Sequence, residues 1–151
     1  MKKIYNIEYL HYDSLEELPE CDLELVKEAR KAVAKSYSAY SHFAVGAALR
    51  LKSGRIVHGA NCESEVFPAG ICAERSALFY SEVNYADDPV EVIAIASSPA
   101  QRECYPCGQC RQVILDVQRR QGNTIKVIMT SEKTASVVLN AENLLPFTFK
   151  L

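Results

Sequence analysis

The segment from Val90 to Ala96 constrains the fold more than any other part of this sequence, because it is almost continuously apolar and β-branched. A strand with one solvated face alternates apolar and polar residues, whereas a nearly unbroken apolar strand is typical of a position covered on both faces. We therefore expect a central strand in a sheet that carries helices on both sides. A chain of 151 residues is the usual size of one domain with such a core.

Periodicity and turn residues predict the other elements. Helical spacing and helix-start signals indicate three helices, over residues 22–38, 72–85 and 107–121. Asp22 is the expected N-cap of the first helix. Further strands are predicted at residues 43–51, 56–60, 125–129 and 136–139.

Two connections between strands are short, and both fix a strand direction. Lys52-Ser-Gly54 reads as a hairpin turn, so the strands beside it should be antiparallel neighbours. Only residues 130–135 separate the last two strands, whereas a parallel crossover needs about a dozen residues or more. The sequence therefore predicts an α/β fold, a three-layer α/β/α sandwich with a mixed sheet of about five strands, the last two antiparallel.

The N-terminal segment precedes the main pattern. We divide the chain into an N-terminal appendage, residues 1–21, and a main domain, residues 22–151. The appendage combines a short β-like stretch, residues 4–12, with Ser14-Leu-Glu-Glu17, which has the spacing of a capping box and is followed by Pro19. Its purpose does not follow from the pattern.

Charge and hydropathy exclude several classes of partner. The formal net charge is −2, with 17 basic residues scattered among 19 acidic ones, so the basic stripe of a nucleic-acid-binding protein is missing. No apolar run approaches the roughly 18 to 20 residues that span a bilayer, and polar residues interrupt the N-terminus where a signal peptide needs an apolar stretch. We therefore expect a soluble cytoplasmic protein that binds neither nucleic acid nor membrane.

The six cysteines are the most informative residues for function. Without an export signal they indicate thiols or metal ligands, not a disulfide framework. In Pro106-Cys107-Gly-Gln-Cys110 two thiols lie three residues apart at a predicted helix start, where the positive end of the helix favours thiolates. Alone, this pair is also compatible with two buried core cysteines. Cys72-Ala-Glu74 adds a third thiol at another predicted helix start, with a carboxylate two residues beyond.

Three protein ligands and one open position form the arrangement of a catalytic zinc site, which lowers the pKa of a bound water to about 7. The ligands of Zn²⁺ would be Cys72, Cys107 and Cys110. Glu74 would then move protons. The alternative is a structural four-cysteine site completed by Cys104 or Cys62, which leaves Glu74 without a role. Cys21, Cys62 and Cys104 are interpreted as ordinary thiols.

Four motifs between Leu23 and Phe149 occur in one order. They are Ala39-Tyr-Ser-His-Phe-Ala-Val-Gly-Ala-Ala48, Gly59-Ala-Asn-Cys-Glu63, Ile71-Cys-Ala-Glu-Arg-Ser-Ala77 and Pro106-Cys-Gly-Gln-Cys-Arg-Gln112. Together they resemble the motifs of the short-chain, homotetrameric cytidine deaminases. The resemblance implies a Zn²⁺-dependent hydrolysis of cytidine or deoxycytidine to uridine or deoxyuridine and ammonia, in pyrimidine salvage. It also implies a homotetramer with shared active sites.

The same resemblance assigns four residues to the substrate. Asn61 and Glu63 match a pair that binds the ribose 3′-hydroxyl, Phe43 matches an aromatic residue that packs on the pyrimidine, and Ala73 is a further substrate-binding position. Three of these residues can also be interpreted as purely structural. Phe43 could be a core aromatic, Asn61 a turn residue and Glu63 a solvated surface charge.

Three more residues receive roles from the resemblance. Glu74 would protonate N3 of cytosine and then carry a proton to the departing ammonia. Arg75 matches an arginine that hydrogen-bonds the metal-bound thiolates. Phe149 matches an aromatic residue that reaches a neighbouring subunit's site, although an isolated Phe is also often a core residue.

One motif departs from the family pattern. Where the family usually has Asn-Val-Glu-Asn-Ala-Ser-Tyr, this chain has Asn61-Cys-Glu-Ser-Glu-Val-Phe67. Glu65 adds a charge and Phe67 lacks a hydroxyl, which changes the contacts expected at the 5′ end of a nucleoside. Two rival functions therefore stay open: deamination of a modified cytosine nucleoside such as blasticidin S, and a zinc-stabilised interaction module without turnover.

Overall fold

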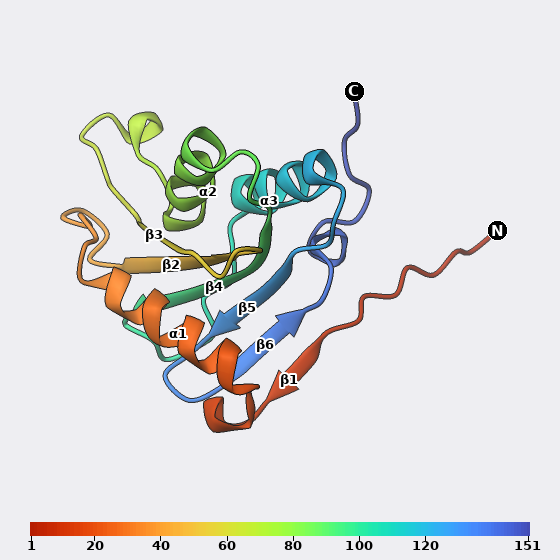
Figure 1. The fold of residues 1–151 in the computed structure, drawn as a ribbon, viewed down its shortest axis with the longest axis horizontal. Helices are drawn as coiled ribbons and strands as arrows, with labels where there is room; N and C mark the ends of the chain where they lie inside the picture. The colour runs from red at the N-terminus through yellow and green to blue at the C-terminus, as the bar shows by residue number, and fades with distance from the viewer.

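A six-stranded sheet forms the centre of the computed structural model, which describes residues 1–151 (Figure 1). Its strands are β1 (Leu10–Tyr12), β2 (Ala44–Leu51), β3 (Ile56–Ala60), β4 (Val90–Ser98), β5 (Lys126–Thr130) and β6 (Ala135–Val138). The strand order is β1-β6-β5-β4-β2-β3, so β4 is an inner strand as predicted. It pairs antiparallel with β2 and parallel with β5. The expected number of about five strands was too low, because the N-terminal segment supplies β1.

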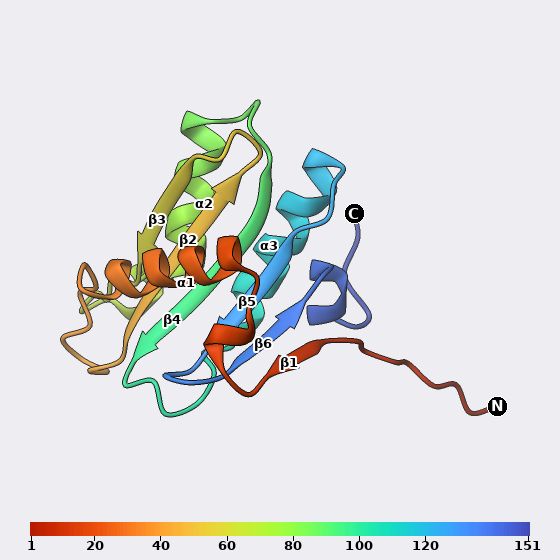
Figure 2. The ribbon, with the colours of Figure 1, turned by 60° about the horizontal axis from the view of Figure 1, so that its bottom comes forward.

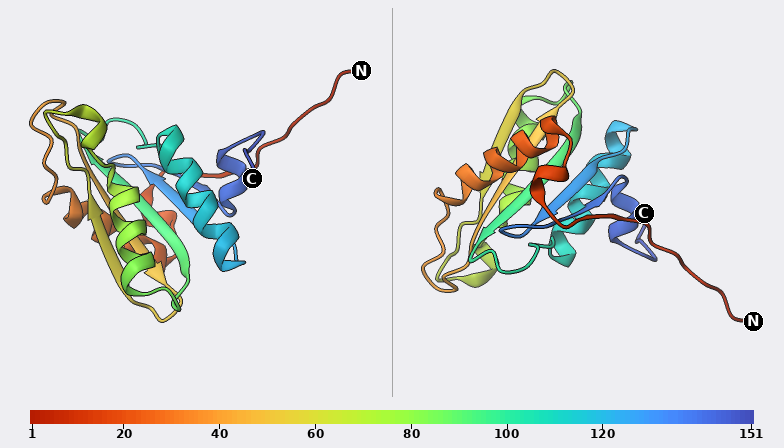
Figure 3. Two further views of the ribbon diagram at one scale, coloured as in Figure 1. Left: turned by 90° about the horizontal axis from the view of Figure 1, so that it is seen from above. Right: turned by 90° about the horizontal axis from the view of Figure 1, so that it is seen from below.

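Three helices cover the two faces of this sheet. α1 (Glu20–Val33) lies on one face, whereas α2 (Ala73–Asn84) and α3 (Gly108–Gln121) lie side by side on the other (Figures 2 and 3). Residues of β4 alternate between the two cores: Ile93 and Ile95 pack on the α2 and α3 side, and Val92 and Ala94 pack on the α1 side. The three-layer α/β/α sandwich is confirmed. None of the helices is long and apolar enough to cross a membrane.

Both short connections join antiparallel strands. β2 and β3 form a hairpin in which Gly46 lies opposite Ala60, and Gly54 in the turn has a φ of +86°, a conformation that glycine adopts without strain. β5 and β6 are also antiparallel, with Ile128 opposite Val137. The direction of the last pair, deduced from the length of its connection, is therefore confirmed.

Asp22 does not cap α1, contrary to the prediction. The helix begins at Glu20, and Pro19, whose φ is −50°, occupies the N-cap position without a side-chain hydrogen bond. The Asp22 carboxylate is buried and forms ion pairs with Arg50 at 3.2 Å and Lys126 at 2.5 Å. A buried carboxylate needs such partners, and they lie on β2 and β5, which no local pattern indicates.

The N-terminal segment divides into an arm and a part of the sheet. Residues 1–9 form an extended arm without regular structure, which contacts the C-terminal segment through the Glu8 carbonyl and Asn143 and through the rings of Tyr5 and Phe147 (Figures 1 and 3). The strand covers only Leu10–Tyr12, not residues 4–12, and it pairs antiparallel with β6, with Leu10 opposite Val137. Leu15 and Leu18 then bury their side chains in the core beneath α1. Residues 10–21 therefore complete one edge of the sheet and part of its core.

A close approach of α2 to β3 positions the start of that helix. A Cβ atom added to Gly59 would lie 2.3 Å from the carbonyl oxygen of Ala73, so only glycine permits this packing. Ala73 is the first residue of α2, and β3 ends one residue before Asn61. The first turn of α2 and the segment after β3 are thereby held next to each other.

Candidate active site

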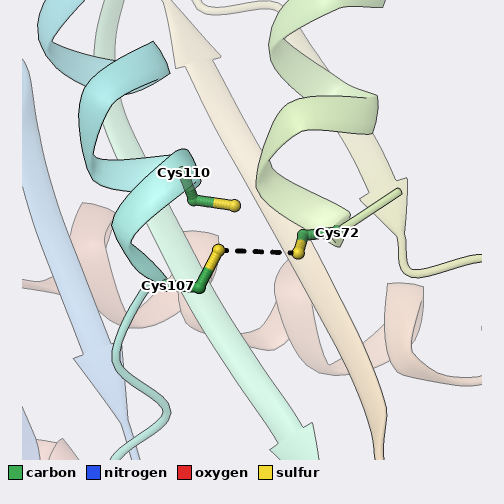
Figure 4. A group of neighbouring side chains, drawn as sticks. All are labelled: Cys72, Cys107 and Cys110. Carbon is green, nitrogen blue, oxygen red and sulfur yellow. Dashed lines mark hydrogen bonds between the residues drawn. The ribbon is translucent and has the colours of Figure 1, made fainter. Parts of the chain in front are cut away.

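The first turns of α2 and α3 bring three thiols together. Cys72 is the N-cap residue of α2, Cys107 is the N-cap residue of α3, and Cys110 lies in the first turn of α3 (Figure 4). Their three sulfur atoms all lie within 4.8 Å of one another, and the Sγ atoms of Cys72 and Cys107 are 3.8 Å apart. The two predicted helix starts therefore face one point in space.

This geometry fits a zinc ion. Two sulfur ligands at about 2.3 Å from a tetrahedral zinc lie about 3.8 Å from each other, which matches the separation of Cys72 and Cys107. The positive ends of two helices favour thiolates at this point. Neither Cys62 nor Cys104 belongs to the group. Burial raises the pKa of the Cys104 thiol to about 11.

The pKa values of Cys72 and Cys110 shift in opposite directions. A hydrogen bond with Cys110 lowers the pKa of Cys72 to about 5, with help from Arg75, although burial opposes the change. The same bond and burial raise the pKa of Cys110. Ionised sulfurs this close together repel one another, and a divalent cation between them offsets that repulsion. The donor set is therefore suited to a metal that prefers thiolates.

Arg75 lies beside the same sulfurs. Its Nη2 atom donates a hydrogen bond to the Cys72 sulfur at 3.7 Å, and its Nε atom is buried without a partner. A guanidinium with an unpaired buried donor next to a thiol cluster fits a centre in which all the sulfurs are ionised. The structure therefore places Arg75 where its predicted role requires it.

Glu74 is buried next to the cluster, with 4 % of its surface exposed. Burial raises the pKa of its carboxyl group to about 7, and the negative sulfur of Cys72 adds to the effect. A carboxyl group whose pKa is raised towards neutrality exchanges its proton more readily at physiological pH than an exposed one. Such a carboxyl group can therefore both accept and donate a proton during one reaction.

Asn61 anchors the segment that precedes β2. Its Oδ1 atom accepts hydrogen bonds from the Ser36 hydroxyl at 2.5 Å and from the Val45 N–H at 2.7 Å, and its Nδ2 atom donates to the Phe43 carbonyl at 2.9 Å. The Tyr37 N–H also donates to the Asn61 carbonyl. These contacts explain why α1 ends at Val33 and does not continue to residue 38, as its periodicity suggested.

Glu63 binds the same segment with its carboxylate. Oε2 accepts from the backbone N–H groups of Tyr40 at 2.8 Å and Ser41 at 3.1 Å, and Oε1 accepts from the Ser41 hydroxyl. These hydrogen bonds lower the pKa of the Glu63 carboxyl group, and the bond from the Ser41 hydroxyl contributes most. A carboxylate has about four acceptor sites and a carboxamide two N–H donors. One acceptor on Glu63 and one donor on Asn61 thus remain free, which suits one hydroxyl group.

A cleft of about 750 Å³ connects this pair to the thiol cluster. Asn61, Glu63, Cys72 and Arg75 all contribute to its lining. Phe67, whose ring is exposed, lies at its rim in an edge-to-face contact with Tyr40, with ring centroids 6.0 Å apart. The structure thus brings Cys72 of the thiol cluster and the predicted sugar-binding pair to one opening.

Comparison with known proteins identifies this arrangement. The family model described as "Cytidine and deoxycytidylate deaminase zinc-binding region" matches residues 19–125. This chain belongs to that deaminase family. The metal of the three-cysteine cluster is accordingly zinc.

Individual deaminases of this family are similar over most of the chain. Over 94 residues the chain is 43 % identical to a cytidine deaminase from Halalkalibacterium halodurans, which covers 62 % of this chain and 69 % of that protein. A crystal structure of cytidine deaminase from Burkholderia pseudomallei superposes with a TM-score of 0.73 at 34 % identity, covering 83 % of this chain and 97 % of that one. A blasticidin-S deaminase from Bacillus cereus is 32 % identical over 101 residues, 63 % of this chain and 71 % of that protein.

The remaining residues that the deaminase motifs singled out lie outside the cleft lining. Phe43, whose ring is 40 % exposed, lines a second cavity together with Cys104 and Tyr105. Ala73 is fully buried in the core of the α2 side. Phe149 is 70 % exposed and lies near Gln112 of α3, apart from the cleft of its own chain. Within one chain the structure does not bring Phe149 to the deaminase centre.

Two kinds of residue escaped the sequence reasoning. Arg111 donates from Nε to the Pro106 carbonyl at 2.8 Å and from Nη1 to the Leu144 carbonyl at 3.2 Å, which fixes the loop before the α3 cysteines. Its place directly after Cys110 in the deaminase motif is the signal that could have found it. Tyr40 and Ser41 bind Glu63 from a distant loop, and no spacing in the sequence indicates that contact.

Proposed function

We propose that this protein is a cytidine deaminase that hydrolyses cytidine, deoxycytidine or both to the corresponding uridine and ammonia. The observation that carries the proposal is the position of Glu74, a buried carboxyl group beside a zinc site with three cysteine ligands and therefore one open coordination position. Membership in the deaminase family supports the same reaction.

Zinc, when bound, lowers the pKa of a coordinated water to about 7 and so supplies the nucleophile at neutral pH. Cys72, Cys107 and Cys110 would hold the metal. Glu74 protonates N3 of the cytosine ring and later delivers a proton to the amino group, which leaves as ammonia. The oxygen of water replaces that amino group at C4, so the balance is cytidine plus water to uridine plus ammonia.

The hydrogen-bond capacity of Asn61 and Glu63 supports a substrate with a sugar. After their contacts within the chain, the pair offers one donor and one acceptor, and a hydroxyl group accepts the first and donates to the second. The 3′-hydroxyl of ribose or deoxyribose is such a group. The exposed ring of Phe67 supports an apolar contact, without a hydrogen bond, at the 5′ end of the nucleoside.

A deaminase of blasticidin S is the second candidate, because the similar Bacillus cereus protein carries that name. The free donor and acceptor on Asn61 and Glu63 favour an unmodified ribose or deoxyribose over a sugar without a 3′-hydroxyl. A zinc-stabilised interaction module without turnover would give no function to the buried Glu74 carboxyl. Its position therefore favours an enzyme.

A deamination assay with ammonia release as the readout tests the function. The zinc-loaded protein should turn over cytidine or deoxycytidine faster than cytosine or blasticidin S. Faster turnover of blasticidin S would move the assignment to the second candidate, and no ammonia from any of the four would remove the enzymatic function.

We also propose that the protein acts as a cytoplasmic homotetramer with shared active sites, in pyrimidine salvage. Phe147 and Phe149 are 94 % and 70 % exposed, and burial of two such rings against another subunit would be favourable. All six cysteines are free, as suits a reducing compartment. Deletion of residues 147–151 should raise the Michaelis constant and weaken assembly while zinc is retained. A fully active wild-type monomer in sedimentation experiments would contradict the assembly.

A further inference from the structure

The backbone of Phe43 is held by hydrogen bonds on both of its polar groups. Its carbonyl oxygen accepts from Nδ2 of Asn61 at 2.9 Å, and its N–H donates to the hydroxyl oxygen of Ser41 at 3.1 Å. The same Ser41 hydroxyl donates its hydrogen to Oε1 of Glu63. Ser41 thus connects the Glu63 carboxylate to Phe43 through one hydroxyl group.

The conformation of the loop needs these contacts. His42, the residue between Ser41 and Phe43, has a φ of +55°, which a residue other than glycine adopts only where its surroundings hold it. The His42 N–H donates to the Ser38 carbonyl at 3.0 Å, and the bonds to Asn61 and Glu63 flank the turn on both sides. The placement of the Phe43 ring therefore depends on the two residues proposed to bind the sugar.

We propose that Ser41 is a positioning residue, whose hydroxyl couples the sugar-binding carboxylate of Glu63 to the placement of Phe43. The proposal rests on the proposed function, since it assigns the ring of Phe43 to the pyrimidine and Glu63 to the sugar. The hydroxyl hydrogen of Ser41 is already donated to Glu63, so Ser41 acts through its two neighbours and not by contact with the substrate. Occupation of Glu63 by a sugar hydroxyl and stacking on Phe43 are then linked events.

Three variants on this loop separate the connection from a general loss of order. Ser41→Ala removes the hydroxyl, Ser41→Thr keeps it, and Ser38→Ala alters a serine of the same loop that makes no side-chain hydrogen bond. Ser41→Ala should raise the KM for deoxycytidine about fivefold to tenfold, the effect of about one hydrogen bond, while kcat changes less than twofold. Ser41→Thr should restore most of the loss, and Ser38→Ala should resemble the wild type.

A double-mutant cycle with Phe43→Ala tests whether Ser41 acts through the ring. In the Phe43→Ala background, Ser41→Ala should have almost no further effect on KM, because the group that it positions is absent. Equal effects of Ser41→Ala in both backgrounds would overturn the proposal, as would a Ser41→Ala protein with the KM of Ser38→Ala.

Amide hydrogen exchange gives a readout that does not depend on turnover. In the zinc-loaded wild type the Phe43 N–H should be protected, and Ser41→Ala should speed its exchange at least about tenfold while Ser41→Thr does not. Unchanged exchange in Ser41→Ala would overturn the proposal even if the enzyme is active. An inactive wild type with the expected exchange pattern would instead contradict the proposed function and leave the connection between Glu63 and Phe43 in place.

Discussion

The zinc cluster and the sugar-side loop lie at one cleft but are built in different ways. The cluster stands on the first turns of two helices, backed by a core in which Cys110, Ala73 and Ala77 are fully buried. The loop from Ser36 to Phe43 has no regular structure and is held by side-chain hydrogen bonds to Asn61 and Glu63.

The two regions are also proposed to have different tasks: the cluster serves catalysis, and the loop serves recognition of the substrate. The groups proposed to move protons and to bind the metal are fixed by packing, which tolerates little displacement. The groups proposed to contact the sugar and the base depend on a few partly exposed hydrogen bonds, each of modest net free energy. We therefore expect substitutions in the cluster to abolish catalysis and substitutions in the loop to shift affinity.

Removal of one metal ligand should have the largest effect. Cys110→Ala should reduce bound zinc from about one per chain to nearly none and abolish deamination, because a site with three protein ligands keeps little affinity with two. Elemental analysis of the purified protein measures the metal. Cys104→Ala, at a neighbouring thiol outside the cluster, should keep its zinc, and loss of zinc in this control would support the four-cysteine structural site.

Glu74→Gln should lower kcat by about 10² to 10⁴-fold, since the amide preserves the shape but cannot relay a proton. Zinc content and unfolding midpoint should stay close to those of the wild type. Glu82→Gln, on the exposed side of the same helix, should be fully active. A loss of less than tenfold in Glu74→Gln would remove Glu74 from its assigned role.

Arg75 contacts both regions, because it lines the cleft and hydrogen-bonds the Cys72 sulfur. Arg75→Gln should weaken zinc affinity about 10 to 100-fold, the usual effect of removing a partner of a metal ligand. Competition with a chelator measures it, with Arg120→Gln as the control on the protein surface. Unchanged zinc affinity together with a raised KM would assign Arg75 to the sugar side instead.

The effect at Asn61 should be smaller than the loss of a metal ligand or of Glu74. Asn61→Ala should reduce kcat/KM for deoxycytidine at least about fivefold, because a hydrogen bond to the sugar is lost together with the bonds that hold the loop. The reduction should be smaller for 2′,3′-dideoxycytidine, which lacks the 3′-hydroxyl. Equal reductions for both substrates would show that Asn61 holds the loop without reading the hydroxyl.

The difference between the zinc cluster and the sugar-side loop also explains what could be predicted from the sequence. The spacing of Cys107 and Cys110 on one helix and the position of Cys72 at the start of another are local features. The amino-acid pattern alone was therefore enough to predict that these three thiols cluster. Asp22 was misassigned because its partners, Arg50 and Lys126, come from distant strands. The end of α1 was misplaced for the same reason, because Ser36 and Tyr37 form hydrogen bonds with the distant residue Asn61.

The N-terminal strand, β1, shows a further limit of local patterns. Alternating apolar residues over 4–12 indicated a strand, but only Leu10–Tyr12 has a partner, because β6 is four residues long and ends at Val138. How much of a potential strand becomes a strand depends on the length of its neighbour. That length cannot be read from the N-terminal sequence itself.

The pairing of β1 with β6 also sets an order of events during synthesis. β1 is synthesised before every other strand of the sheet, and its only strand partner, β6, is the strand synthesised last. At about 5 to 20 residues per second, the chain needs about 6 to 25 seconds to make the intervening residues. During that time Leu15 and Leu18 lack the Ala135 and Val137 side of their core. Leu15 and Leu18 therefore remain without part of their core until β6 has been synthesised.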